Sequence, residues 1–226
     1  MNSELSVVIY ILVFLGSMLN VMKECTLEIM ESFHDDEEII GGNVVKLIGL
    51  SGSLIGSKTP VGVDTVLQFV KNNHPEIEVE LIDLRDYKEI EFCDGRQLED
   101  YNEHTQSVIQ KMMDADFYVI GTPIYQSSLT GVLKNVFDLL PVQSIYNKVM
   151  GFLATGGTYQ HYLVVENQLK PIAGFFRSYV APSYVYLNSD HFDAENNIKD
   201  TEALSRLEKL AEELVFMQTQ LKASSR

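Results

Sequence analysis

The chain has 226 residues, enough for one domain plus an extension, because single domains commonly have roughly 100–150 residues. Its 46% hydrophobic and 22% charged residues are ordinary globular composition and exclude wholesale disorder. A formal charge of −15 argues against a non-specific nucleic-acid binder, which needs a basic surface. Two cysteines, Cys25 and Cys93, supply neither a disulfide framework nor a metal-ligand spacing, and they favour a reducing, cytoplasmic compartment.

Residues 1–43 form an N-terminal extension that differs from the rest of the chain. An apolar run over residues 5–22 is near the short limit for a membrane span, and an acidic linker follows it. The run has neither a positive start nor a small-residue cleavage site, so it is not typical of a signal peptide. Three interpretations stay open: a membrane anchor, a helix that packs on the body or on a partner, or an upstream stretch with Met22 as the working start.

Residues 44–226 alternate between short apolar runs and helical patterns, as one α/β domain would. The apolar runs predict strands over residues 44–50, 78–84, 116–121, 149–154 and 179–187. Apolar residues three and four apart predict helices from about residue 59 to a stop at 72–75, and over 103–113, 128–139, 159–174 and 201–221. This alternation predicts a doubly wound, five-stranded parallel sheet with strand order 2-1-3-4-5 and helices on both faces.

In such a sheet, ligands bind beyond the carboxyl ends of the strands, near the point where the strand order reverses. The loop after the first predicted strand, residues 51–59 (the first loop), places hydroxyls and one ammonium at the start of a helix, where backbone amides attract anions. Its candidate phosphate ligands are Ser51, Ser53, Ser57, Lys58 and Thr59. The spacing matches neither a nucleoside-triphosphate P-loop nor the dinucleotide glycine pattern. The alternative is a polar turn with no ligand.

Two further loops follow the third and fourth predicted strands. In residues 121–131 (the second loop), Pro123, Ile124 and Tyr125 could form a wall for a flat ring, although a capped turn with Ser127 or Ser128 as the helix N-cap explains them as well. In residues 154–161 (the third loop), paired glycines leave room for a planar group against bare backbone, or serve a simple flexible turn. The expected strand order brings all three loops to one crevice.

Taken together, the three loops resemble the NADPH-dependent FMN reductase family, which has the flavodoxin-like fold. The resemblance covers residues 44 to about 187. It rests on the first loop and on two longer segments, Thr122-Pro123-Ile124-Tyr125 with Leu129-Thr130-Gly131, and Ala154-Thr155-Gly156-Gly157-Thr158. It implies that the first loop binds the FMN phosphate. The isoalloxazine ring would then lie against Pro123, Ile124, Tyr125, Thr155, Gly156, Gly157 and Thr158. Many members have an arginine in the first loop; here Leu54 and Ile55 stand at the best candidate positions, so Lys58 is the expected cation.

The resemblance implies a reductase that takes a hydride from NADPH to FMN and passes electrons on to a flavin, quinone or azo-type acceptor. No catalytic side chain and no metal are expected, because the cofactor carries the chemistry. The alternatives are a flavodoxin-like electron carrier that does not itself oxidise NADPH, and a flavin-free interaction protein or membrane-tethered scaffold on the same fold. Family members are commonly dimers or tetramers, so a homodimer or homotetramer is expected. Expected partners are FMN and NADPH, with a flavin-dependent oxygenase or a small-molecule acceptor.

The sequence leaves three features of this hypothesis open. These are the choice between NADPH and NADH, the retention or release of FMN, and the compartment. A cytoplasmic protein is expected, and a membrane anchor through residues 5–22 is the alternative.

Overall fold

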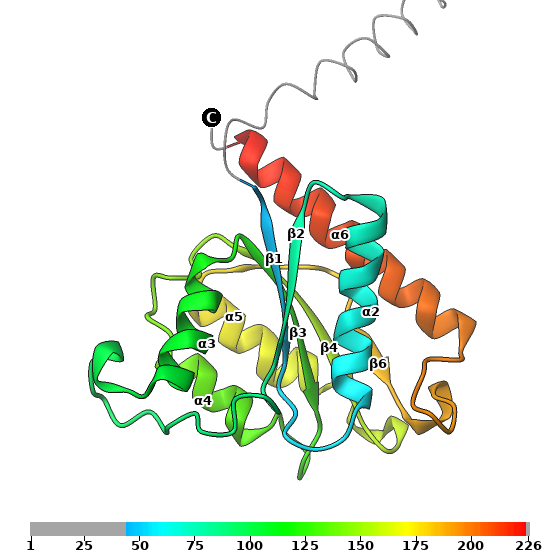
Figure 1. Ribbon diagram of the computed structural model, residues 1–226. Coiled ribbons are helices and arrows are strands. Elements are labelled where there is room, and N and C mark those ends of the chain that lie inside the picture. The colour runs from blue at the N-terminus through cyan, green and yellow to red at the C-terminus, as the bar shows by residue number, and fades with distance from the viewer. Residues whose placement is uncertain (1–43, 225–226) are drawn as a thin grey trace, which may run out of the picture. The chain divides into compact units, whose positions relative to one another are not determined.

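The computed structural model describes residues 44–224, so the N-terminal extension and its apolar run lie outside the described residues. Its central sheet is parallel and has the strand order β2-β1-β3-β4-β5 (Figure 1). The strands are β1 (Lys46–Ser51), β2 (Glu78–Asp83), β3 (Phe117–Pro123), β4 (Val149–Thr155), β5 (Tyr179–Val180) and β6 (Val185–Leu187). The predicted order is confirmed, and the first loop connects β1 to a helix beside the point of reversal.

The fifth predicted strand, residues 179–187, is present as two short segments. Both pair with β4: Tyr179 lies opposite Val149 and Val185 lies opposite Leu153. Between them stands Pro182, which has no N–H to donate to a ladder. The prediction of one continuous strand is therefore wrong in its middle.

Helices cover both faces of the sheet, as predicted. One face carries α2 (Lys58–Asn73) and α6 (Thr201–Ser224), and the other carries α3 (Glu103–Asp114), α4 (Gly131–Leu139) and α5 (Lys170–Phe175) (Figure 1). Along β1, Leu47 packs with α2 and α6, and Ile48 packs on the opposite face. Gly49 is the exception to a filled face, because a Cβ there would lie 2.7 Å from atoms of both Val63 and Leu67. The missing side chain lets α2 approach the sheet.

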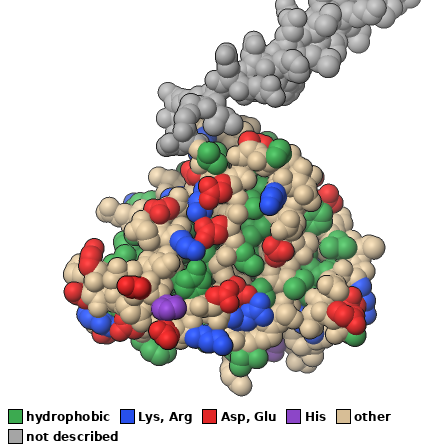
Figure 2. All heavy atoms as spheres, in the orientation of Figure 1, with side chains coloured by type: hydrophobic (Ala, Val, Ile, Leu, Met, Phe, Trp, Pro, Cys, Tyr) green, Lys and Arg blue, Asp and Glu red, His purple; other side chains and the backbone are tan. Residues whose placement is uncertain are grey.

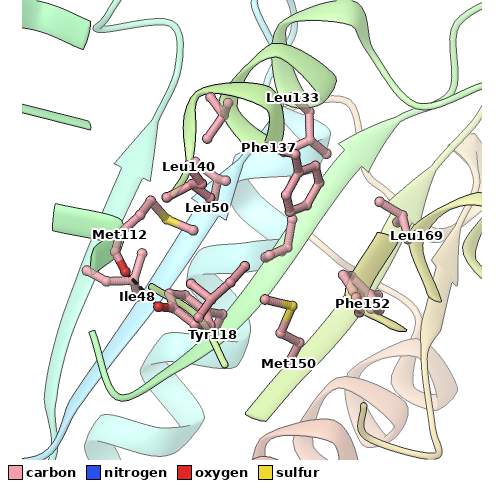
Figure 3. Close-up of a cluster of buried hydrophobic side chains, with 14 of the residues drawn as sticks. Ile48, Leu50, Met112, Tyr118, Leu133, Phe137, Leu140, Met150, Phe152 and Leu169 are labelled. Atoms are coloured by element: carbon pink, nitrogen blue, oxygen red, sulfur yellow. Dashed lines mark hydrogen bonds between the residues drawn. The ribbon is translucent and has the colours of Figure 1, made fainter. Parts of the chain in front are cut away.

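The core under α3, α4 and α5 is formed by buried apolar side chains. Figure 3 shows Leu133 and Phe137 of α4 in one cluster with residues of the strands such as Met150 and Phe152. The hydroxyl of Tyr118 in this cluster donates to the carbonyl of Met112 at 2.6 Å and so is satisfied inside the protein. This cluster extends along the sheet to the loops at the carboxyl end.

Two predicted helices differ in the structure: one starts later, and the other is divided into three parts. The helix predicted over 128–139 starts at Gly131, with Thr130 as the N-cap whose hydroxyl accepts from Leu133 N. Ser127 and Ser128 are not the cap, because the chain there closes into a separate turn. The helix predicted over 159–174 is divided into a 3₁₀ turn η3 (Tyr159–His161), a π-helical turn η4 (Val165–Leu169) and the short α5. Pro171, in the first turn of α5, has no N–H for the helical ladder.

The face that carries β2 and α2 shows acidic and basic side chains interspersed rather than gathered by sign (Figure 2). On the edge strand β2, Glu80 lies 2.6 Å from Lys46 Nζ and 2.7 Å from Lys111 Nζ. Paired charges of this kind discourage another strand from adding to the edge. Within residues 44–224, no helix is both long and apolar enough to cross a membrane.

Candidate functional site

The three loops meet at the carboxyl end of the sheet. Gly52 N, in the first loop, donates to Gly121 O at the start of the second loop at 2.8 Å. The hydroxyls of Thr59 and Thr155 lie 2.6 Å apart and join the first loop to the third. Ile124 N donates to Thr155 O at 2.9 Å and joins the second loop to the third. Hydrogen bonds therefore join the three loops to one another, and two of these bonds involve Thr155.

The first loop keeps hydrogen-bond donors that the protein itself does not use. Ser51 Oγ is fully buried and has no hydrogen-bond partner among the described residues. Ser57 caps α2 without a side-chain bond to it, and the first turn of α2 has no acidic residue to offset its positive end. Ser53 Oγ, in contrast, donates to Ile55 O at 2.6 Å. Hydroxyls and amides at a helix N-terminus are suited to the oxygens of a phosphate.

Two cations flank the first loop. Lys58 Nζ donates to Ser189 Oγ at 3.0 Å and lies 5.4 Å from the centre of the Phe192 ring, so its side chain extends to the turn after β6. Arg85 Nη1 donates to Gly56 O at 3.0 Å from the β2 side. The hydrogen bond to Asp83 raises the pKa of Arg85 and holds its side chain beside the first loop. Sequence reasoning missed Arg85, because nothing local in the sequence links it to a loop 29 residues earlier.

The second loop ends β3 and turns sharply. Pro123 is the last residue of β3 and pairs opposite Thr155. Tyr125 and Ser128 exchange two backbone hydrogen bonds of 3.0 Å each, which close a tight turn. The Tyr125 side chain is 45% exposed beside the fixed Ile124 backbone. An aromatic ring that is held at its backbone and open to solvent on one side can stack on another flat ring.

The third loop is fixed from below by β6. Gly156 N donates to Leu187 O at 2.9 Å, and the hydroxyl of Tyr186 donates to Thr158 O at 2.5 Å. A Cβ on Gly156 would collide with that hydroxyl, whereas Gly157 has open space around it. Burial raises the pKa of Tyr186, which keeps the hydroxyl a donor. Sequence reasoning missed the role of Tyr186 beneath the glycine pair, because Tyr186 meets Thr158 only in the folded chain.

The third loop is also joined to the turn after β6 at its far end. The hydroxyl of Tyr159 lies 3.3 Å from Nε2 of the buried His191, and the two rings meet edge to face. Lys58 reaches Ser189 in the same turn, η5 (Ser189–His191). Lys58, expected as a free cation for a phosphate, thus has a partner of its own in this turn.

The family model described as NADPH-dependent FMN reductase matches residues 45–192. The chain belongs to this family. A relative from Geobacillus thermodenitrificans, named NAD(P)H-dependent FAD/FMN reductase, is 55% identical over 179 residues, which are 79% of this chain and 96% of the relative.

Solved structures show the same fold. The flavoenzyme FerB from Paracoccus denitrificans, an NAD(P)H:(acceptor) oxidoreductase, has a TM-score of 0.63 at 17% identity and covers 78% of this chain and 98% of its own. A flavodoxin from the domain Archaea has a TM-score of 0.55 at 10% identity and covers 77% and 99%. At these identities the likeness shows the fold alone, which is flavodoxin-like, as predicted.

Proposed function

We propose that this chain is an NAD(P)H-dependent FMN reductase. The observation that carries the proposal is the meeting of the three loops at Thr155 in a chain of this family. When bound, FMN accepts a hydride from the nicotinamide nucleotide and passes electrons on to a second acceptor. The work of the protein is to bind and orient the two rings.

Each loop has a role in this proposal. Ser51 and Ser57 donate to the phosphate together with the amides of α2. Ser53 and Thr59 exchange their bonds inside the protein for bonds to the phosphate, and Lys58 supplies the positive charge. The isoalloxazine ring would be held by Pro123, Ile124 and Tyr125 of the second loop and by Thr155, Gly156, Gly157 and Thr158 of the third. The Ser51 hydroxyl, which has no partner within residues 44–224, and the bare Gly157 backbone support this assignment, because both leave room for bonds to a ligand.

The wider features of the sequence-based hypothesis stay predictions. These are a homodimer or homotetramer, a cytoplasmic location, a division of the chain at residue 44, and a flavin, quinone or azo-type acceptor. Partnership with a flavin-dependent oxygenase belongs with them.

The test is a flavin titration of the full chain followed by anaerobic mixing with NADPH or NADH. We expect FMN to bind more tightly than riboflavin, because only FMN has the phosphate. We also expect loss of the flavin absorbance band on mixing with at least one of the two nucleotides. Bound FMN that neither nucleotide reduces would instead indicate the electron carrier. Failure to bind any flavin would refute the proposal.

A matched pair of variants tests the phosphate assignment. Lys58→Met is expected to weaken FMN about tenfold and riboflavin little, because a charge-assisted bond to phosphate contributes roughly 1.5–3 kcal/mol at most. Lys134→Met, on the exposed side of α4 where Lys134 pairs with Asp138, is the control and should change neither affinity. Equal losses for FMN and riboflavin in Lys58→Met would contradict the assignment.

A further inference from the structure

The turn in the second loop has an unusual backbone. Gln126 and Ser127 are consecutive non-glycine residues with positive φ, 49° and 64°. Two-residue turns with positive φ at both central positions normally contain Asn-Gly or another glycine pair, because a Cβ disfavours this region. A conformation of this kind persists where surrounding groups hold it, and such positions cluster at functional sites.

One side chain from a distant element holds this turn. Gln168, in η4, accepts from Ser128 Oγ at 2.7 Å and from Leu129 N at 3.2 Å through the same oxygen. Its amide nitrogen donates to Ser127 O at 3.2 Å. A single half-buried amide therefore satisfies a hydroxyl, a backbone donor and a backbone acceptor of the turn.

The three hydrogen bonds of Gln168 also affect the position of Tyr125. On one side of Tyr125, Ile124 N is fixed to Thr155 O. On the other side, the Tyr125 backbone is bonded to Ser128 across the turn, and Ser128 is in turn held by Gln168. If the bonds to Gln168 are lost, the backbone before Tyr125 stays fixed at Ile124, but the backbone after Tyr125 becomes free to move, and the exposed ring moves with it.

We propose that Gln168 is a positioning residue for the ring-binding part of the site. Its amide holds the Tyr125–Ser128 turn in the positive-φ conformation before flavin arrives, so that binding requires no reordering of Tyr125. This inference rests on the proposed flavin-binding function, but its first test needs no flavin.

That test uses the absence of tryptophan from the chain. Tyr125→Trp places a single indole at the turn, and its fluorescence is measured in flavin-free protein with and without Gln168→Met, which keeps the side-chain volume and removes all three bonds. We expect lower anisotropy, easier quenching by acrylamide, and faster amide exchange at Leu129. Gln110→Met is the control, since exposed Gln110 donates to Asp114 on its own helix, α3. Unchanged fluorescence and exchange would overturn the proposal.

The second test concerns flavin in the natural Tyr125 background. Gln168→Met is expected to weaken FMN and riboflavin by the same factor, about tenfold, because the ring and not the phosphate is affected. Changing Gln126→Asn and Ser127→Gly in addition installs the sequence that favours this turn by itself. It should restore most of the lost affinity.

The outcomes separate this inference from the proposed function. Absence of rescue would show that Gln168 acts on the flavin in another way and would overturn the positioning role. Loss of FMN affinity without loss of riboflavin affinity would overturn it as well. A wild-type protein that binds no flavin would overturn the proposed function together with this inference. That result is seen before any substitution is made.

Discussion

The two ends of the sheet differ in whether their polar groups are hydrogen-bonded within the protein. At the amino end, where the strands begin, polar groups are paired inside the protein. Lys148 Nζ donates to Met113 O at 2.7 Å, and Asp116 accepts from Lys46 N at 2.7 Å and pairs with Lys222 at 3.2 Å. Burial lowers the pKa of Lys148 and raises that of Tyr118, whose hydroxyl lies 3.3 Å away. This end uses its polar groups for the fold.

At the carboxyl end, polar groups and aromatic rings remain available. Ser51 Oγ is buried without a partner among the described residues, and the rings of Tyr125 and Tyr159 are 45% and 60% exposed. Two consecutive residues, Gln126 and Ser127, have positive φ. The difference teaches that stability and binding are separated along the strands, so substitutions at the two ends should affect different measurements.

The largest expected effect is on stability at the amino end. Tyr118→Ala removes a fully buried ring and should lower the free energy of unfolding by about 3–5 kcal/mol. Urea unfolding measures this loss, and a flavin titration of the folded protein should show affinity within about twofold of wild type. Tyr118→Phe is the control that keeps the ring and loses the two bonds of the hydroxyl, to Met112 O and from Lys148 Nζ. A loss of flavin affinity as steep as the loss of stability would break the comparison.

A smaller effect is expected at the carboxyl end, and there it falls on FMN affinity and not on stability. Ser51→Ala should weaken FMN about fivefold, since a hydrogen bond contributes about 1 kcal/mol, and leave stability within about 0.5 kcal/mol, because no protein bond is lost. Calorimetric titration and urea unfolding measure the two quantities. Ser53→Ala is the matched variant, and it should lower both because Ser53 also bonds to Ile55 O. If Ser51→Ala destabilised the protein and left FMN affinity intact, Ser51 would belong to the fold and not to the site.

The positions of the strands and the meeting of the three loops could be predicted from the sequence, because they depend on local patterns of apolar residues. Buried parallel strands are continuous apolar runs, so β1, β3 and β4 were located within about two residues, and the order of the strands then brought the three loops together. The resemblance of those loops to one family supplied the function.

The parts that sequence missed depend on side chains that meet only in the folded chain. Gln168 reaches a turn about 40 residues earlier, and Tyr186 reaches Thr158 from another strand. The break of the predicted helix over 159–174 was missed because its apolar spacing does not distinguish π and 3₁₀ turns from α-helix. The break in the fifth strand did have a signal, Pro182, since proline in a strand argues against a continuous ladder.

The smallest effect concerns the ion pairs of β2 and depends on pH. Burial by itself would raise the pKa of Glu80, but hydrogen bonds from Lys111 and Lys46 outweigh it and hold the pKa below its ordinary value of 4.5. The folded state therefore favours the carboxylate. This contribution to stability is present above about pH 4.5 and is lost as the pH falls through the folded-state pKa.

Glu80→Gln should thus lower the free energy of unfolding by up to about 1 kcal/mol at neutral pH, and by much less once the wild-type carboxylate is protonated. Urea unfolding across the acid range measures the difference, and added salt should reduce it at neutral pH. Glu78→Gln is the control, because Glu78 is 55% exposed and lies 3.3 Å from Lys46, and it should have a smaller effect. Flavin affinity should be unchanged in both variants. A difference that is the same at neutral and acid pH would show that Glu80 stabilises β2 by packing and not by its charge.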